Sequence, residues 1–467
     1  MKIEHLDASA DRPAATVPLS GARAASAPTV VRWRIFWLLL LLSSINYIDR
    51  ASLSIAMPLI SAEFTLSPAM EGVLLSSFFW TYALMQIPSG LLVDRFKSRT
   101  IIGIATVAWG ACQGIAAGCF HWIPLVLTRL GLGIAEAPVM PAGAKLAGSW
   151  LTPAERGKGA ALLDGGAPLG SAFGAIIISA LIGLLGSWRM AFVVAGVGTV
   201  IVGIFAWRYI RNAPAEHPGV NAAELAHIEQ GIAAPRLRRA ALDATGAAGA
   251  AGRASPAGAG RSEAPPRFMT LLKDRSVLFM FASWACYNSV FYGLMTWMPS
   301  YLHKAHGFDL KQMGGATFVI FLTGFVGELF GGWLADKWRA SGAAPNLVMR
   351  TMFCSAGLIA GLTILAVAFA TTPVSVVVLL SIALFFIRWC GMFWGVPATL
   401  GGQARAGLLA GSMNFSGNIV GVLVPILIGV IVQVTGTYFL ALMFFVAAAC
   451  GLALCAGLID YRDRGLN

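Results

Sequence analysis

An acidic and a basic residue stand next to each other in a segment that is otherwise apolar. Asp49 and Arg50 lie between the runs IFWLLLLL and IAMPLI. An ionised side chain in the middle of a membrane helix costs roughly 2.5–3.5 kcal/mol on insertion scales and is normally kept for function. Neighbouring helix positions point about 100° apart, so the two charges do not simply neutralise one another. Arg50 instead shares a face with Asn46 and Tyr47, while Asp49 points toward a different partner.

A second pair of charges, Arg129 and Glu136, lies in another apolar segment. Because they are seven residues apart, they share one helix face at a rise of about 10 Å, which long side chains nearly bridge. Together with Asp49 and Arg50 they make four intramembrane charges of balanced sign, which suggests a polar cavity between helices. The alternative is a static ion-pair network that holds the two segments together.

The elements that carry these charges are expected to be membrane-spanning helices. Hydrophobic residues make up 57% and charged residues only 12% of the chain, and the mean hydropathy is +0.75, far from an ordinary soluble domain. A bilayer span needs about 20 mainly apolar residues, and runs of this length are too long for the strands of a barrel. We therefore expect an all-α polytopic membrane protein. Its twelve predicted spans cover 33–57, 69–92, 100–119, 122–148, 158–183, 188–209, 275–300, 313–335, 348–370, 374–399, 406–433 and 437–459.

The net charge of +12 indicates membrane topology rather than a nucleic-acid partner. Lys and Arg collect in alternate loops, as the positive-inside rule describes. Both termini are therefore expected in the cytoplasm, which is consistent with an even number of spans. No apolar h-region near the start marks a cleavable signal. The basic loop residues are Arg95, Lys97, Arg99, Arg156, Lys158, Lys337, Arg339, Arg350 and Arg405, together with the Arg-rich stretch 208–275.

Two halves of the chain resemble each other. GLLVDR at 90–95 follows the second predicted span and GWLADK at 332–337 follows the eighth, an offset of 332 − 90 = 242. With six spans in each half, such repeats relate the halves by an axis along the membrane normal. A stretch rich in Ala, Gly, Pro and Arg between them cannot build a core of its own. The expected parts are a disordered cytoplasmic N-terminus (1–32), a six-helix half (33–209), a cytoplasmic linker (210–274), a second six-helix half (275–459) and a cytoplasmic tail (460–467).

Twelve spans, a long central loop and the repeated GxLxD[RK] motif resemble the major facilitator superfamily, over nearly the whole chain from about residue 33. The glycine lets the loop run close to its neighbour, and the Asp can pair with bases and latch the halves in one state. Lys97 and Ser98 stand where a glycine and a base are typical. The latch formed by the first copy of the motif is therefore expected to be weaker or to use different partners. Alternatively, these charges only determine topology. The expected gating residues are Gly90, Asp94, Arg95, Arg99, Asp336 and Lys337.

Longer strings resemble one branch of that superfamily, the anion:cation symporter family, which includes bacterial hexuronate, glucarate and galactonate transporters. These strings are NYIDRASLSIAMP in the first span, RLGLGIAEAPVMPA in the fourth and HPGVNAAELAHI after the sixth. The resemblance implies proton-coupled symport of an organic anion by alternating access, with a sugar acid as the expected substrate.

The resemblance also implies roles for individual residues. Asp49 and Glu136 would be the protonatable acids, with Arg129 as the partner of Glu136. Arg50 would hold a substrate carboxylate, for which a permanently charged planar guanidinium is suited. If protonation of Glu136 releases Arg129, and an anion on Arg50 favours protonated Asp49, proton and anion binding are positively linked. Further expected substrate contacts are Tyr47, Tyr82, Trp394 and Asn414, and also Asn288 and Tyr292, which are four residues apart in the seventh span.

Three residues leave the substrate class open. Span five carries Asp164 and span ten carries Arg388, and Ala167 stands where sugar-acid members can have a hydrogen-bonding side chain. A pocket with fewer hydroxyl partners and an extra arginine as a substrate contact fits a dicarboxylic or aromatic acid, such as tartrate, phthalate or hydroxyphenylacetate, at least as well. Equally, Arg388 could pair structurally with Asp164 or snorkel along its helix.

No sequence pattern points to an enzyme or to ATP as the energy source. The chain contains no GxxxxGK[ST] phosphate loop and no histidine cluster, so neither a cofactor nor a metal is expected and the proton gradient would supply the energy. The expected partners are a small organic anion, protons and the lipid bilayer of the bacterial inner membrane, without nucleic acid, and the chain is expected to be a monomer. A non-transporting anion sensor and a proton-coupled efflux antiporter are the alternatives.

Overall fold

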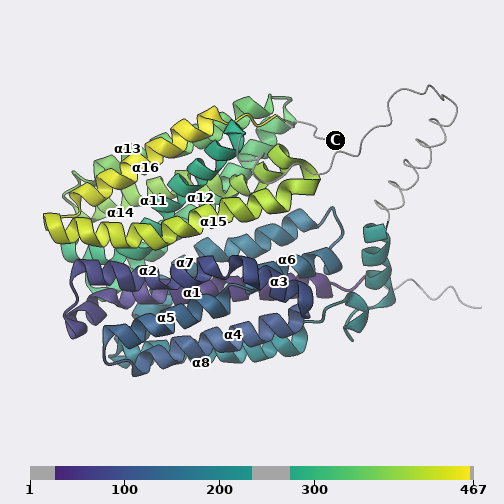
Figure 1. The fold of residues 1–467 in the computed structure, drawn as a ribbon, viewed down its shortest axis with the longest axis horizontal. Coiled ribbons are helices and arrows are strands. Elements are labelled where there is room, and N and C mark those ends of the chain that lie inside the picture. The colour runs from purple at the N-terminus through teal and green to yellow at the C-terminus, as the bar shows by residue number, and fades with distance from the viewer. Residues whose placement is uncertain (1–26, 234–273, 463–467) are drawn as a thin grey trace, which may run out of the picture.

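The computed structural model describes residues 27–233 and 274–462, and in these ranges the regular structure is helical (Figure 1). The all-α prediction is confirmed. The first group of helices is α1 (Val31–Phe64), α2 (Pro68–Leu84), α3 (Gln86–Arg95), α4 (Ser98–Ile115), α5 (Trp122–Glu136), α6 (Val139–Trp150), α7 (Arg156–Leu185) and α8 (Trp188–Tyr209). The second is α11 (Arg275–His306), α12 (Leu310–Ala340), α13 (Pro345–Val367), α14 (Pro373–Ile387), the 3₁₀ segment η3 (Arg388–Gly395), α15 (Val396–Thr435) and α16 (Phe439–Leu458).

Eleven stretches of the described residues are long and apolar enough to cross a membrane, and α2 with α3 completes the predicted set of twelve. The predicted second and fourth spans are not single helices. The second breaks at Met85, because Pro88 has no N–H for the carbonyl four residues earlier and its ring crowds that carbonyl. The fourth breaks between α5 and α6, where Pro138 interrupts the helix.

The two groups of helices lie side by side, the first in purple to blue and the second in green to yellow (Figure 1). Across the boundary α2 packs on α15, α7 on α12 and α1 on α11. Glycines allow the closest approaches. A Cβ on Gly72 of α2 would lie 2.4 Å from the carbonyl oxygen of Pro425 in α15. Any larger side chain there would push the two groups apart.

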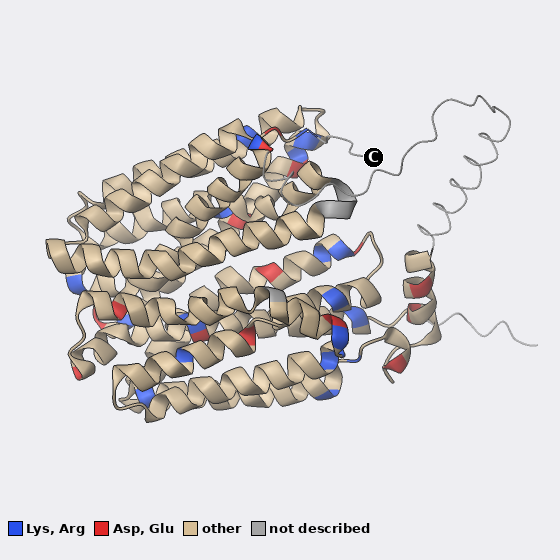
Figure 2. Ribbon diagram, viewed as in Figure 1, with Lys and Arg blue, Asp and Glu red and all other residues tan. Residues whose placement is uncertain are grey.

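Lys and Arg gather mainly at one end of the bundle (Figure 2). We call this the basic end; it holds residues 94–99, 152–156 and 208–212, and the other end, with residues 65–67, 186–187 and 307–309, is the opposite end. The distribution agrees with the charge pattern of the loops.

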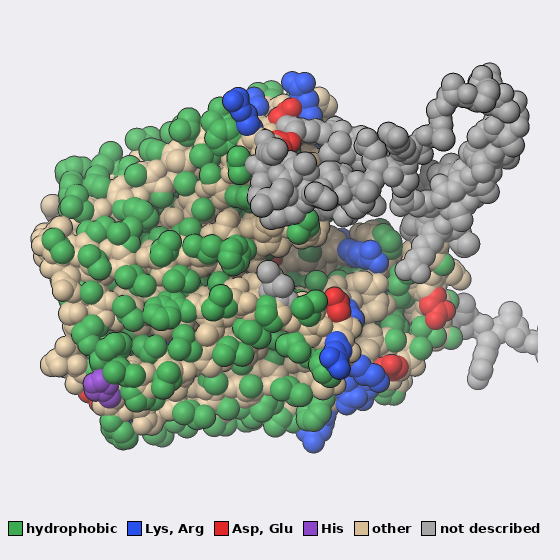
Figure 3. Space-filling view, in the orientation of Figure 1, with side chains coloured by type: hydrophobic (Ala, Val, Ile, Leu, Met, Phe, Trp, Pro, Cys, Tyr) green, Lys and Arg blue, Asp and Glu red, His purple; other side chains and the backbone are tan. Residues whose placement is uncertain are grey.

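The two groups are joined at the opposite end. Lys304 at the end of α11 donates to the buried carboxylate of Glu71 in α2 at 2.6 Å, and the backbone N–H of Ala69 donates to Gln433 of α15 at 3.2 Å. At the basic end, the described residues form no ion pair between the two groups. Figure 3 shows a hollow between the groups near that end. The bundle is therefore closed at one end and open at the other.

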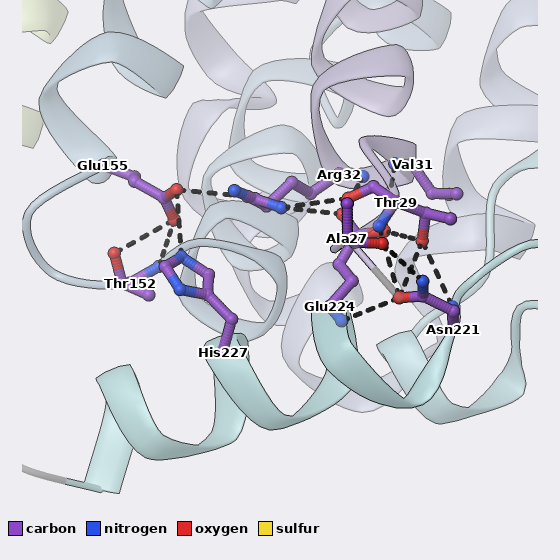
Figure 4. Close-up of polar contacts among 9 residues, drawn as sticks. All are labelled: Ala27, Thr29, Val31, Arg32, Thr152, Glu155, Asn221, Glu224 and His227. Atoms are coloured by element: carbon purple, nitrogen blue, oxygen red, sulfur yellow. Dashed lines mark hydrogen bonds and ion pairs between the residues drawn. The ribbon is translucent and has the colours of Figure 1, made fainter. Parts of the chain in front are cut away.

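A short helix over residues 222–233 lies against the start of α1 at the basic end (Figure 4). Its Glu224 accepts hydrogen bonds from the backbone N–H groups of Val31 and Arg32, each at 3.1 Å, and from the Thr29 hydroxyl at 2.5 Å. The first N–H groups of a helix have no partner inside the helix, so the carboxylate caps α1 and complements its dipole.

Arg32 extends this cap to the loop before α7. Its guanidinium reaches Glu224 at 2.9 Å and Glu155 at 3.1 Å. Burial alone would raise the pKa of Glu224, but the hydrogen bonds from Thr29, Arg32 and Val31 outweigh it, and the pKa lies below the ordinary value. The first part of the predicted linker is thus bound to the first group. The rest of the predicted linker, most of the predicted N-terminal segment and part of the tail lie outside the described residues.

Candidate functional site

Arg50 lies in the middle of α1 among aromatic rings from two helices. Its guanidinium carbon is 4.5 Å from the ring centre of Tyr47, 4.4 Å from that of Phe78 and 4.7 Å from that of Tyr82. A cation over an aromatic face is attracted by the ring quadrupole, more strongly when water is excluded. The structure thus brings together the three residues Arg50, Tyr47 and Tyr82 that the sequence placed in one site.

Glu136 of α5 is the ion-pair partner of Arg50. One carboxylate oxygen accepts from Nε and from an Nη of Arg50, both at 3.3 Å, and both side chains are buried. The other oxygen has no partner among the described residues. Arg50, which reaches across from α1, is therefore the direct partner of Glu136 in this structure, and the expected partner Arg129 interacts with Glu136 only electrostatically.

Arg129 instead joins α5 to α1 and α4. It donates to the backbone carbonyl of Asp49 at 3.5 Å and to the side chain of Gln113 at 2.9 Å. One oxygen of the buried Asp49 carboxylate accepts from the Trp109 indole at 3.1 Å, and the other has no described partner. Trp109 and Gln113 were not predicted from the sequence. They could have been, because two side chains with polar groups, four residues apart in an apolar span, share one helix face.

Space next to Arg50 lies between the two groups. A cavity of about 20 Å³, room for about one water molecule, is bordered by Arg50, Ser54, Phe79 and Arg129 from the first group and by Met295 and Thr296 of α11. Both arginines therefore lie at the boundary between the two groups of helices.

The expected contacts from the second group lie in two places. Tyr292 of α11 touches Phe79 of α2, with ring centres 4.7 Å apart, and Asn414 of α15 donates to Gln86 of α3 at 3.4 Å. Both therefore reach the first group.

Asn288 and Trp394 both lie beside Trp284, and Trp394 also interacts with Asp164 of α7 in the first group. Asn288 donates to the carbonyl of Trp284 at 2.8 Å, and the ring of Trp394 lies 5.4 Å from that of Trp284. As substrate contacts they remain predictions.

Arg388 is buried and belongs to a second charged cluster, whose two acids are partly exposed. It donates to the Tyr287 hydroxyl at 2.6 Å and forms an ion pair with Glu328 of α12. Asp164 of α7 interacts electrostatically with both Glu328 and Arg388. The suggested structural pairing of Arg388 with Asp164 is thus only part of the arrangement, because Glu328 is its direct partner. Glu328 escaped the sequence analysis, although it is an acid in an otherwise apolar stretch of α12.

The expected gating residues stay within their own groups in this conformation. Arg99 donates to the carbonyl of Trp207 at 2.7 Å, and Lys145 donates to the backbone carbonyl of Asp94 at 3.4 Å. Lys337 lies 5.0 Å from the ring centre of Trp333. The remaining ones behave likewise: Asp336 pairs with Arg339, Arg95 lies against Phe96 and Gly90 faces open space. A latch between the groups remains a prediction for the conformation with the basic end closed.

Comparisons with known proteins agree with this architecture. The chain is 31% identical to a protein of Bacillus subtilis (strain 168) named "Probable galactarate/D-glucarate transporter GudP", over 91% of each chain. It is 30% identical to the "Probable L-galactonate transporter" of Escherichia coli (strain K12), over 91% of this chain and 87% of the relative. It is also 30% identical to the "Probable sulfoacetate transporter SauU" of Cupriavidus necator, over 88% of this chain and 90% of the relative. The expected likeness to sugar-acid transporters is confirmed.

The fold is also found among solved structures. A bacterial homologue of the human lysosomal transporter Spinster, in an inward-facing and unoccupied conformation, superposes with a TM-score of 0.67 at 19% identity, covering 92% of this chain and 94% of that one. The family model described as "Major Facilitator Superfamily" matches residues 39–425. Membership of a family of membrane transporters agrees with the absence of an enzyme motif in the sequence. The chain belongs to the major facilitator superfamily.

Proposed function

We propose that this protein carries an organic anion across the membrane together with protons, by alternating access. The observation that carries the proposal is the buried Arg50–Glu136 ion pair beside the boundary of the two groups. Arginine keeps its charge under physiological conditions and presents a planar fork to carboxylates. In this structure the carboxylate of Glu136 occupies that fork, where a substrate carboxylate would bind.

The pair links proton binding to anion binding. While Glu136 is ionised, it competes with the substrate for the same guanidinium. A proton on Glu136 removes the competing charge and frees Arg50 for the anion. Each ligand therefore favours the other, and by linkage the coupling is reciprocal. Asp49 and Arg129 form the second acid and base of the site, and a proton on Asp49 would offset part of the charge that the anion brings.

The ends of the bundle supply the alternating access. The basic end faces the cytoplasm by the positive-inside rule, so the protein stands open to the cytoplasm, with both termini there. The ion pair of Glu71 with Lys304 closes the outside. Rocking of the two groups about the central site would break these contacts and close the basic end. The proposed location is the inner membrane of a bacterium.

A sugar acid is the proposed substrate, supported by relatives named as transporters of galactarate, D-glucarate and L-galactonate. A dicarboxylic or aromatic acid is the second candidate, because Arg388 adds a second buried guanidinium in the other group. A non-transporting anion sensor would use the same Arg50 site without flux.

Proton uptake into proteoliposomes tests the proposal. An internal pH dye reports acidification as galactarate, glucarate, galactonate, glucuronate, tartrate, phthalate or hydroxyphenylacetate is added outside, for the unmodified protein and for Asp49→Asn. Acidification with one acid, absent in the variant, supports symport and identifies the class. Arg50-dependent binding without any acidification would contradict symport and favour a sensor.

A further inference from the structure

The second charged cluster is shared by the two groups of helices. Asp164 comes from α7 of the first group, whereas Glu328 on α12 and Arg388 at the start of η3 come from the second. The backbone places them together: a Cβ on Gly165, next to Asp164, would lie 4.0 Å from the ring of Phe325, one turn before Glu328. This cluster is separate from the Arg50–Glu136 pair. The proposed function uses only the charge of Arg388, for its second candidate substrate, and gives no role to the two acids.

The cluster contains more acid than base. Two carboxyl groups, Asp164 and Glu328, face one guanidinium, that of Arg388. The other titratable groups that face it are Tyr287 of α11, Tyr47 of α1 and Cys390 of η3. Phenols and thiols are neutral near pH 7, so these three add no charge. With both acids ionised, the cluster would carry one uncompensated negative charge inside the membrane.

Arg388 cannot neutralise both acids from where it lies. Its side chain is 5% exposed, and its two Nη atoms are engaged by Tyr287 and Glu328. Its Nε is buried and has no partner among the described residues. The guanidinium is thus oriented toward Glu328 and does not donate to Asp164. When two carboxyl groups are held close together, the charge of one disfavours ionisation of the other.

We propose that Asp164 and Glu328 share one proton, and that this carboxyl pair is a second proton site of the protein, separate from Asp49 and Glu136. The proton is held while α7 and α12 are in contact at this level. It belongs to the pair rather than to either residue. In terms of the proposed symport, on which this role rests, the pair would add one proton per transport cycle.

The position of Asp164 and Glu328 in the bundle determines the side to which their proton would be released. At the opposite end α12 is packed on α7 so closely that a Cβ on Gly314 would lie 2.1 Å from the hydroxyl of Ser179. Asp164 is eight residues from Arg156, the first residue of α7, or about 12 Å from the basic end. Further opening at the basic end, with the opposite end closed, therefore moves Asp164 away from Glu328. Glu328 keeps its ion pair with Arg388, and Asp164, exposed to water, gives its proton to the cytoplasm.

Infrared spectroscopy of the purified full-length protein tests the shared proton without any transport. The C=O stretching band of protonated carboxyl groups is recorded at neutral pH for the unmodified protein, Asp164→Asn and Glu328→Gln. Each amide is nearly isosteric with the acid it replaces and leaves the other acid alone with Arg388, where it ionises. Both variants are therefore expected to lose the same band, equal to one protonated carboxyl per molecule. Glu63→Gln, at an acid paired with Arg189 outside the cluster, is expected to keep it.

A band that persists in either cluster variant overturns the inference. The role in transport is measured separately, as protons taken up per galactarate in proteoliposomes. A ratio lower by one in Glu328→Gln supports the role, and an unchanged ratio contradicts it. If the unmodified protein moves no anion, the proposed symport fails, while the infrared result still decides whether the pair holds a proton.

Discussion

Arg50 and Glu136 come from helices that are not neighbours in the chain, and two hydrogen bonds of 3.3 Å join them in the interior of the bundle. The guanidinium of this pair lies against the rings of Tyr47, Phe78 and Tyr82. One oxygen of Glu136 remains without a partner among the described residues. An acid held by a single cation, with an unsatisfied oxygen, is suited to exchange its position with an incoming carboxylate.

Replacing Arg50 by Lys is expected to weaken anion binding by roughly 10- to 100-fold, because a charge-assisted hydrogen bond contributes about 1.5–3 kcal/mol and lysine cannot present a fork. Binding of galactarate to detergent-solubilised protein, measured by calorimetry, checks this. Arg189→Lys is the matched control, since Arg189 pairs with Glu63 near the opposite end and should bind as the unmodified protein does. Equal affinity in Arg50→Lys would exclude this guanidinium as the anion site.

Replacing Glu136 by Gln is expected to separate anion exchange from proton coupling. The amide carries no charge at any pH, so Arg50 stays free for the anion and binding no longer requires a proton. Exchange of labelled for unlabelled substrate should continue in proteoliposomes, while accumulation driven by a pH gradient should be lost. Glu63→Gln should retain both activities. If Glu136→Gln still accumulates substrate with the same pH dependence, another group carries the coupled proton.

The sequence was sufficient for the helical class and for the four buried charges Asp49, Arg50, Arg129 and Glu136, because apolar length and intramembrane charges are both visible along the chain. It was not sufficient for the pairing. Helical periodicity places Arg129 and Glu136 on one face, but which helix packs against that face depends on contacts between segments distant in sequence. The ion pair of Arg50 with Glu136 is such a contact. Glu328 was not predicted for a related reason. The sequence shows an acid on α12, but its interaction with Asp164 and Arg388 depends on how three distant segments pack.

A bulky side chain at Gly72 is expected to keep the outside from closing. The Cβ alone would stand 2.4 Å from the carbonyl oxygen of Pro425, so Gly72→Val should hold α2 and α15 apart. Transport should fall to background, while anion binding from the outer side is retained. Gly198→Val in α8 is the control, because nothing lies within 4 Å of its Cβ position. Normal transport by Gly72→Val would show that this contact is not required for alternation.

Replacing Glu224 by Gln is expected to lower the free energy of unfolding at neutral pH by about 2 kcal/mol. The ionised cap on the first turn of α1 and its ion pair with Arg32 are lost together. The pKa of Glu224 is lowered in the folded protein, so its contribution is present above the ordinary value of 4.5 and is lost as the pH falls through the folded value. The difference in melting temperature between the unmodified protein and the variant should therefore shrink in acid. Glu229→Gln, at an exposed acid on the same helix, should melt as the unmodified protein does throughout. At low pH a protonated Glu224 is neutral, as a glutamine is. If the difference in melting temperature stayed constant down to low pH, the loss of stability in the variant would therefore not come from the lost charge, and the prediction would be contradicted.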